Sequence, residues 1–226
     1  MQALGLAKFA AGHGVVLCIG AHCDDIEIGC GGTVLRLLEL NPALDFHWVV
    51  LCSNEARRQE ALEGARRFLG RDAEKRVQIQ GFRDGFLPYL GGEVKDLFER
   101  LKGQLQPDLI LTHFRSDLHQ DHRLVSDLTW NTFRDHLILE FEIPKYDGDL
   151  GAPNFFVPLS EALVARKIEH VMGAFASQHG RRWFSADTFR ALMRLRGVEC
   201  NAPDDYAEAF YARKLVLEPR PHTARR

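Results

Sequence analysis

Two short stretches of the 226-residue chain gather side chains that could hold a metal ion. The first, residues 21–27, contains His22, Asp24 and Asp25. The second, residues 113–123, contains three histidines and two aspartates: His113, Asp117, His119, Asp121 and His122. A catalytic zinc ion typically takes three imidazole or carboxylate ligands and leaves a position for water. The metal lowers the pKa of that water and polarises a carbonyl oxygen, so the residue types suggest metal-assisted hydrolysis.

Each stretch directly follows an apolar run that we interpret as a buried strand, residues 15–20 and residues 107–112. Helices are expected soon after, at about residues 31–40 and 124–133. The carboxyl ends of parallel strands lie at one edge of a sheet, where ligands bind in open α/β folds. The two stretches can therefore converge on one site.

The rest of the chain continues the alternation of strand and helix. Further strands are expected at residues 46–51, 77–81, 137–141 and within 206–217, and helices at 55–69, 94–105, 161–176 and 186–197, with a loop at 145–154. Strands separated by connections of twenty or more residues favour a parallel sheet with right-handed crossovers. We therefore predict an α/β fold, a Rossmann-like, mostly parallel sheet flanked by helices on both faces. No repeat or linker divides it, so a single domain over residues 1–226 is expected.

Composition narrows the class of protein. Hydrophobic residues make up 46% of the chain, enough for a sizeable core, and the net charge of −2 gives no reason to expect nucleic acid as a partner. No apolar run approaches the roughly 20 residues of a membrane span, and no signal peptide is expected. Five cysteines without a CxxC pair fit a reduced, cytoplasmic protein. The arginine-rich tail, residues 220–226, is interpreted as a solvated end.

One arrangement of the two stretches uses three groups as metal ligands: His22, Asp25 and His122. The residues alone do not decide between His119 and His122 as the ligand. Asp24 points in another direction from Asp25 and is free to act as the general base. His119 would then bond a substrate oxygen or protonate the leaving group, and Asp121 would fix its tautomer. A lone histidine is usually a surface or satisfied polar residue, but four histidines in two such stretches favour a metal site.

The same stretches resemble a known family. Residues 21–27, followed by Gly29 and the Gly-Gly-Thr of residues 31–33, resemble the AHPDDE-x-G-x-GGT signature of the LmbE-like, or PIG-L, family. Residues 119–123 resemble its HPDHR signature. The resemblance implies a zinc-dependent N-deacetylase that removes an N-acetyl group from an N-acetylglucosamine-type conjugate by attack of zinc-activated water on the amide. Family substrates include glycosylphosphatidylinositol, mycothiol and bacillithiol precursors, antibiotics and chito-oligosaccharides.

The resemblance also implies roles for individual residues. It gives the zinc ligands as His22, Asp25 and His122. Asp24 corresponds to the general base and His119 to the residue that stabilises the tetrahedral intermediate, with Asp121 tuning it. Arg57 and Asp84 correspond to substrate contacts. Two nitrogens and a carboxylate oxygen would also accept iron, cobalt or nickel. The partner is expected to be a small amino-sugar conjugate, and the oligomeric state, including a homo-oligomer, stays open.

The chain departs from the family pattern at three positions. Cys23 and Gln120 replace prolines, and Phe175 stands where the family often has a histidine before x-Ser-Gln. We interpret Cys23 as a spacer between ligand and base. Arg181 and Arg182 could bind a phosphate or carboxylate, or could simply be solvated.

Two other functions fit parts of the pattern. A metal-dependent hydratase of a small unsaturated acid would use the same site, and arginine-rich pocket walls would favour it. A non-catalytic binding module would keep the fold, but the complete set of acidic and histidine side chains argues against it. An acetate assay distinguishes the deacetylase from the hydratase, and metal analysis tests the binding module.

Overall fold

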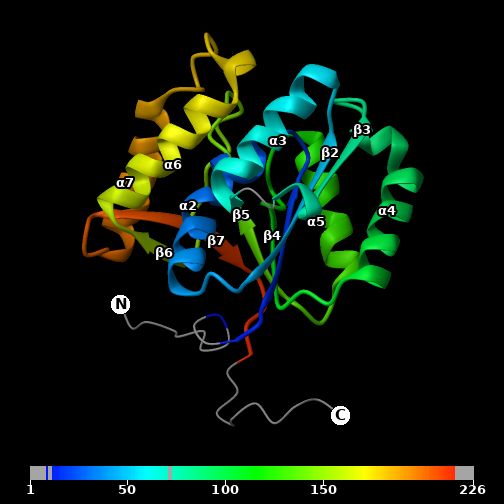
Figure 1. Cartoon of the computed structure of the whole chain (residues 1–226), viewed down its shortest axis with the longest axis horizontal. Helices are drawn as coiled ribbons and strands as arrows, with labels where there is room; N and C mark the ends of the chain where they lie inside the picture. The colour runs from blue at the N-terminus through cyan, green and yellow to red at the C-terminus, as the bar shows by residue number, and fades with distance from the viewer. Residues whose placement is uncertain (1–8, 10–11, 71–72, 217–226) are drawn as a thin grey trace.

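The computed structural model describes Phe9 and residues 12–70 and 73–216. One sheet has seven strands in the order β3-β2-β1-β4-β5-β7-β6 (Figure 1). The strands are β1 (Val15–Gly20), β2 (Asp45–Cys52), β3 (Val77–Phe82), β4 (Leu109–His113), β5 (Leu137–Phe141), β6 (Phe155–Leu159) and β7 (Tyr206–Ala212). The first five strands are parallel to one another, whereas β7 runs antiparallel to both β5 and β6. The predicted mostly parallel sheet is confirmed.

Helices cover both faces of this sheet, as predicted (Figure 1). They are α2 (Asp25–Leu40), α3 (Glu55–Leu69), α4 (Gly91–Gln104), α5 (Gln120–Thr132), α6 (Glu161–Ala174) and α7 (Ala186–Cys200), with short 3-10 turns at Ala73–Arg76, Leu87–Leu90 and Ala176–Gln178. Buried side chains of α2, α3, α6 and α7 share one core, and those of α4 and α5 share the other.

Strand β1 divides these two cores. Its side chains alternate, so that Val16 and Cys18 contribute to the core under α2 and α3 while Leu17 and Ile19 contribute to the core under α4 and α5. All four are fully buried. A strand that is covered on both faces carries a continuous apolar run rather than an alternating one, which is why this segment was recognisable from sequence.

The structure differs most from the expected elements in three places. Helix α5 begins at Gln120, four residues earlier than expected. Helix α2 begins at Asp25, six residues earlier than expected, because its glycine-rich first half lacks an apolar helical pattern. Strand β6 was not predicted; it lies at the sheet edge and contains Pro158, which removes a strand hydrogen-bond donor. The 220–226 tail lies outside the described residues. Among the helices that are described, none has the length and apolar character to cross a membrane.

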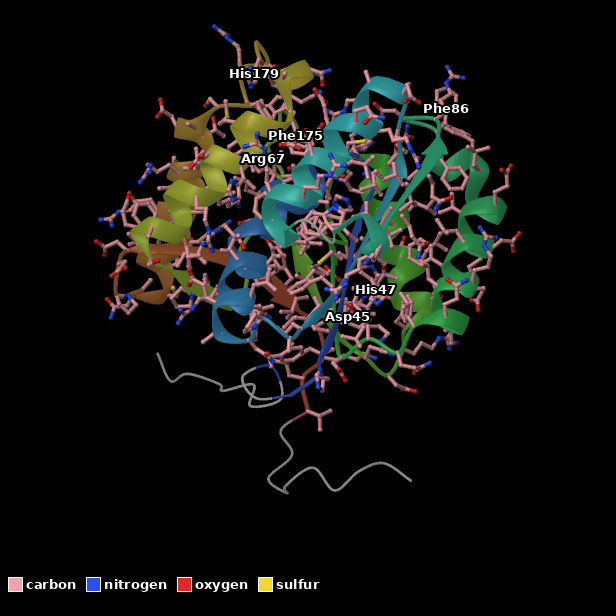
Figure 2. All side chains as sticks on the ribbon, viewed as in Figure 1. Asp45, His47, Arg67, Phe86, Phe175 and His179 are labelled. Carbon is pink, nitrogen blue, oxygen red and sulfur yellow. The ribbon has the colours of Figure 1, made fainter. Side chains whose placement is uncertain are left out.

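The direction in which successive strands are added to the sheet reverses at β1, in the centre of the parallel part. The chain passes outward from β1 to β2 and β3, then returns through α4 to β4 on the other side of β1. Such a switch point is where ligands bind in open α/β sheets. Phe86 and Phe175 mark the end of the molecule at which the parallel strands finish, and Asp45 marks the start of β2 at the opposite end (Figure 2). The polar turns after β1 and β4 lie at the first of these ends.

The close fit of α2 on the sheet generates a prediction. A Cβ atom at Gly29 would lie 2.3 Å from the Phe141 ring, which is itself fully buried. We expect Gly29→Ala to lower the free energy of unfolding by about 1–3 kcal/mol through overpacking. Gly103→Ala in α4, where nothing lies within 4 Å of a new Cβ, is the control and should be neutral or slightly stabilising. Denaturant unfolding of both variants measures this difference, and equal stabilities would contradict the close fit.

Candidate functional site

Turns and first helical turns position the polar side chains at the strand ends. His22 lies in the turn after β1, Asp24 is the N-cap residue of α2, and Asp25 is the first residue of that helix. After β4, His119 is the N-cap residue of α5, and His122 lies in its first turn. Each helix therefore presents its N-terminus, which favours negative charge, to one shared space.

Three side chains with potential ligand atoms face one another in this space. Nδ1 of His22 lies 3.1 Å from Nε2 of His122 and 3.3 Å from Oδ2 of Asp25. Nε2 of His122 lies 3.6 Å from Oδ1 of Asp25. A tetrahedral ion with bonds of about 2.0–2.2 Å to nitrogen and oxygen separates its ligand atoms by roughly 3.3–3.6 Å. The spacing of these three side chains therefore fits a metal ion.

Other combinations within the described residues also bring ligand atoms within reach of one ion. His119 can join His22 and His122, and His113 can join Asp25 and His122. A third group combines His22 with Cys52 and Asp121. These side chains together form one metal-competent cluster, which offers more than one possible set of ligands.

His22 and His122 each have carboxylate partners at the ring nitrogen that points away from the shared space. Nδ1 of His122 lies 2.9 Å from Oδ2 of Asp117. Nε2 of His22 lies 3.1 Å from Oδ1 of Asp84 and 3.3 Å from Oδ2 of Asp121. Carboxylates in this position are typical behind metal-ligating histidines, where they fix the tautomer and the orientation of the ring.

The electrostatics of the cluster favour a cation. Burial lowers the pKa of His22, but the charge of Asp25 and the hydrogen bonds to Asp121 and Asp84 outweigh it and raise that pKa well above its ordinary value. Burial also works against ionisation of Asp25, yet the surrounding histidines hold the pKa of Asp25 well below its usual range. Without a metal, a proton on His22 supplies the positive charge that these carboxylates favour.

Arg57 does not extend freely into the site. Its Nη2 donates to Oδ1 of Asp24 at 2.6 Å, and its Nη1 donates to Oε2 of Glu60 at 3.2 Å and to Oγ of Ser177 at 3.1 Å. Glu60 also accepts from the backbone N–H and the hydroxyl of Ser177. The predicted substrate contact is therefore an ion-pair partner of Asp24, tied through Glu60 to the turn after α6.

Asp121 has partners other than the expected one. Its carboxylate accepts from the backbone N–H groups of Gly85 at 2.7 Å and Leu87 at 3.1 Å. The bond that joins it to His119 comes instead from its backbone N–H, which donates to Nδ1 of His119 at 3.3 Å. The Asp121 carboxylate bonds His22 and the loop after β3, and the backbone N–H of Asp121 bonds the His119 ring, so the role of that carboxylate in fixing the tautomer of His119 stays a prediction.

A cavity of about 360 Å³ opens beside this cluster. It is lined mostly by polar side chains: His22, Cys52, Ser53, Asn54, Arg57, Arg83 and Asp84. The side chain of Asp84 is 79% exposed apart from its contact with His22 and is free to meet a ligand. Arg181 and Arg182 are solvent-exposed and do not line this cavity, whereas Trp183 packs against the core.

Two of the three residues that depart from the family pattern, Cys23 and Phe175, are buried. The Cys23 thiol donates to the carbonyl oxygen of Cys52 at 3.3 Å, and burial raises its pKa to about 12. It is therefore a neutral thiol rather than a thiolate ligand. Phe175 is fully buried, with the Arg57 guanidinium 5.8 Å from its ring centroid. An apolar ring here offers packing under α3 and no polar contact to a substrate.

Three residues that contact the proposed ligands or their partners, His113, Asp117 and Lys145, had no role assigned from the sequence. His113 and Asp117 stand in the second stretch, but only the structure shows that Nε2 of His113 lies 3.1 Å from Oδ2 of Asp25. The same nitrogen lies 2.9 Å from the backbone nitrogen of Ala21, so it either accepts from that N–H or donates to Asp25, but not both. Lys145 donates to Asp117 at 3.0 Å from a loop with no sequence signal. Proximity along the chain could have suggested the first two, but not Lys145.

The family comparison agrees with this geometry. Residues 17–133, just over half of the chain, match the PIG-L family model, described as GlcNAc-PI de-N-acetylase. The chain belongs to the PIG-L family. The matched region includes both metal-competent stretches and ends with α5.

Solved structures share the fold over almost the whole chain. The N,N'-diacetylchitobiose deacetylase from Pyrococcus horikoshii is 21% identical, with a TM-score of 0.70 over 91% of this chain and 86% of that one. A conserved protein from Thermus thermophilus is 24% identical, with a TM-score of 0.72 over 92% and 99%. The 4-carboxy-2-hydroxymuconate hydratase from Pseudomonas putida is 17% identical, with a TM-score of 0.67 over 92% and 100%. At these identities the likeness concerns the fold, so this PIG-L member's reaction must be argued from its side chains.

The contact behind His122 generates a prediction. Asp117→Asn keeps the size of the side chain but removes the negative charge 2.9 Å from Nδ1 of His122. We expect it to weaken Zn²⁺ affinity by about ten- to a hundredfold, since outer carboxylates orient the ring and raise its basicity. Asp127→Asn, at an exposed position of α5, is the matched control and should bind Zn²⁺ like wild type. Competition with a chromogenic chelator measures both, and unchanged affinity in Asp117→Asn would contradict this role.

Proposed function

We propose that the protein is a metal-dependent hydrolase that removes the N-acetyl group from an N-acetylglucosamine-type conjugate, giving the free amine and acetate. One observation carries the proposal. A buried carboxylate, Asp24, and a half-buried imidazole, His119, stand beside the ligand set formed by His22, Asp25 and His122. Membership of a family described by a de-N-acetylase supports the same reaction.

His22, Asp25 and His122 are the proposed ligands. Their nitrogen and carboxylate atoms have the spacing described above, and carboxylates support both rings. A zinc or other divalent ion bound there supplies Lewis-acid activation of a water molecule and of the amide oxygen. His113 is the proposed holder of Asp25, because its ring lies against the carboxylate and is stacked on His122 with centroids 3.9 Å apart.

Asp24 is the proposed general base. It is almost completely buried, and burial raises its pKa above the ordinary value even though the Arg57 charge acts in the opposite direction. A base with a raised pKa takes a proton from water more readily, and afterwards it can return that proton to the leaving amine. Arg57 holds Oδ1 of Asp24 at 2.6 Å and so fixes the direction in which the other carboxylate oxygen points.

His119 is the proposed donor to the oxygen that gains charge in the reaction. Its Nδ1 accepts from the backbone N–H of Asp121, so in the neutral ring the proton is carried by Nε2. Burial lowers the pKa of His119, which favours the neutral ring. A neutral ring with its N–H directed outward can donate to an oxyanion without first losing a proton.

The cavity suits a polar, sugar-sized ligand. Its lining of Asn54, Arg57, Arg83 and Asp84 supplies both donors and acceptors for hydroxyl groups. Asp84 is the proposed direct contact, since its exposed carboxylate already points to His22. Arg181 and Arg182, which suggested the hydratase alternative, are exposed and do not line the cavity, whereas Arg57 and Arg83 do line it, so the assay of acetate release decides between the two reactions.

Replacing the proposed base tests the reaction. We expect Asp24→Asn to retain Zn²⁺ affinity and to lower the rate of acetate release from N-acetylglucosamine conjugates by about 10²–10⁴-fold. An acetate-coupled assay over such conjugates, with metal content measured in parallel, gives both quantities. Wild-type rates in the metal-loaded variant would refute the role of Asp24. Turnover of an unsaturated acid by the wild type without acetate would favour the hydratase.

His119 can be tested separately. His119→Ala removes the Nε2 donor while leaving the proposed ligands in place, so we expect kcat to fall by about 10²–10³-fold with little change in KM. His179→Ala provides a control, because its ring bonds the carbonyl oxygen of Met172 at the surface. A rise in KM with unchanged kcat would instead make His119 a binding residue.

A further inference from the structure

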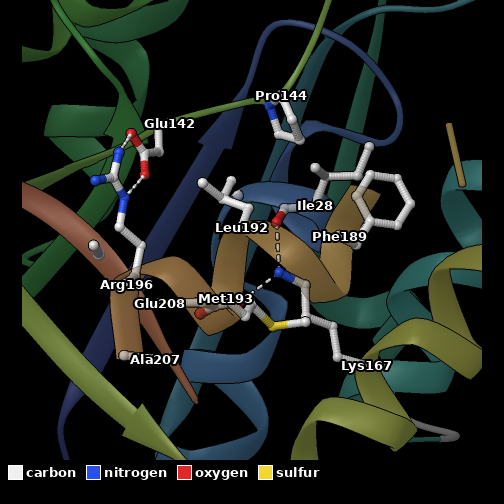
Figure 3. A pocket seen from close by; sticks show the side chains of 12 residues that line it. Ile28, Glu142, Pro144, Lys167, Phe189, Leu192, Met193, Arg196, Ala207 and Glu208 are labelled. Carbon is white, nitrogen blue, oxygen red and sulfur yellow. Dashed lines mark hydrogen bonds and ion pairs between the residues drawn. The ribbon is translucent and has the colours of Figure 1, made fainter. Parts of the chain in front are cut away.

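A buried ion pair reaches the backbone of α2. Nζ of Lys167, in α6, lies 2.6 Å from Oε1 of Glu208, in β7, and both side chains are almost completely buried. Lys167 also donates to the carbonyl oxygen of Ile28 at 2.6 Å (Figure 3). Glu208 accepts from the backbone N–H groups of Gly32 at 2.7 Å and Thr33 at 2.6 Å.

The backbone groups involved are a helical pair. In an α-helix the N–H of Gly32 faces the carbonyl of Ile28, four residues earlier. Here Lys167 bonds the carbonyl, Glu208 bonds the N–H, and the two side chains bond each other. The ion pair thus holds both groups of one i, i+4 position of α2, and the helix stays continuous from Asp25 to Leu40.

Glycine at position 32 lets the Glu208 carboxylate approach the backbone of α2 closely. A Cβ atom there would lie 2.9 Å from Oε1 of Glu208 and 2.5 Å from Cδ1 of Leu159. The Gly-Gly-Thr part of the signature contributes no ligand to the metal-competent cluster. Its backbone instead provides the two N–H groups that Glu208 holds, which accounts for glycine at this point of the motif.

We infer that Lys167 and Glu208 are positioning residues for the metal centre. The first turn of α2 contains Asp25 and ends near Ile28, the residue whose carbonyl Lys167 holds. Fixing that carbonyl fixes the direction of the turn, and with it the distance of Asp25 from His22 and of the N-cap residue Asp24 from the shared space. The consequence for catalysis rests on the proposed function; the consequence for metal binding does not.

The test compares two buried ion pairs. Glu208→Gln and Lys167→Met each break the pair that bridges α2. Glu142→Gln breaks the pair between Glu142 and Arg196, which lines the same small cavity and is similarly buried (Figure 3). We expect all three to lower stability, but only the first two to weaken Zn²⁺ affinity, by about ten- to a hundredfold, and to alter the visible spectrum of the Co²⁺-loaded protein.

A conservative variant keeps the test decisive if Glu208→Gln fails to fold. Glu208→Asp keeps the charge opposite Lys167 but withdraws the carboxylate by one methylene from Gly32 and Thr33. Faster amide exchange at these two residues, with weakened Zn²⁺ binding and an altered Co²⁺ spectrum, is expected. Metal affinity and Co²⁺ spectra equal to those of Glu142→Gln would overturn the inference. Since neither readout needs a substrate, a wild-type protein that binds metal but releases no acetate would refute only the proposed function.

Discussion

Buried carboxylates that repel one another are the physical constraint on which the rest of the site depends. Five acidic side chains are almost fully buried near the ends of β1 and β4: Asp24, Asp25, Glu27, Asp117 and Asp121. A buried charge is tolerated only with a partner or as its neutral form. Four have partners: an arginine, histidine rings, a lysine or backbone N–H groups. The side chain of the fifth, Glu27, has no hydrogen-bond partner among the described residues, and burial raises its pKa well above the usual value, which favours the neutral form.

The neighbouring elements follow from this constraint. Helix α3 supplies the cation for Asp24, and the loop after β5 supplies Lys145 for Asp117. The turn before α4 supplies backbone N–H groups for Asp121. Elements far apart in the sequence are thereby tied to one edge of the sheet. Removing Arg57 would leave the buried Asp24 carboxylate without its ion-pair partner, which costs about 3–5 kcal/mol in comparable buried pairs, so the site and the stability of this edge depend on the same contacts.

Local patterns were sufficient for most of the fold and for the members of the cluster. The apolar run of β1 and the helical spacing in α3 could be read directly, and α3 has the predicted bounds. What could not be read depends on contacts between distant segments. Arg57 bonds Asp24 because α3 crosses beside α2, and the role of the Asp121 carboxylate depends on the loop after β3. Strand β6 is defined by its antiparallel partner β7, whose pairing no local pattern encodes.

The signature after β1 combines two kinds of constraint. Its acidic and histidine residues are explained by the metal-competent cluster, and its glycines by close packing: Gly29 against Phe141, and Gly32 against the carboxylate of Glu208. The close packing at the glycines positions the acidic and histidine residues, because the helix that carries Asp25 can lie this close to the sheet only where side chains are absent. A deacetylase and a hydratase share the fold at similar TM-scores. The glycines are therefore expected wherever this helix packs in the same way, whereas the proposed reaction would depend on the Nε2–H of His119 and the buried carboxylate of Asp24.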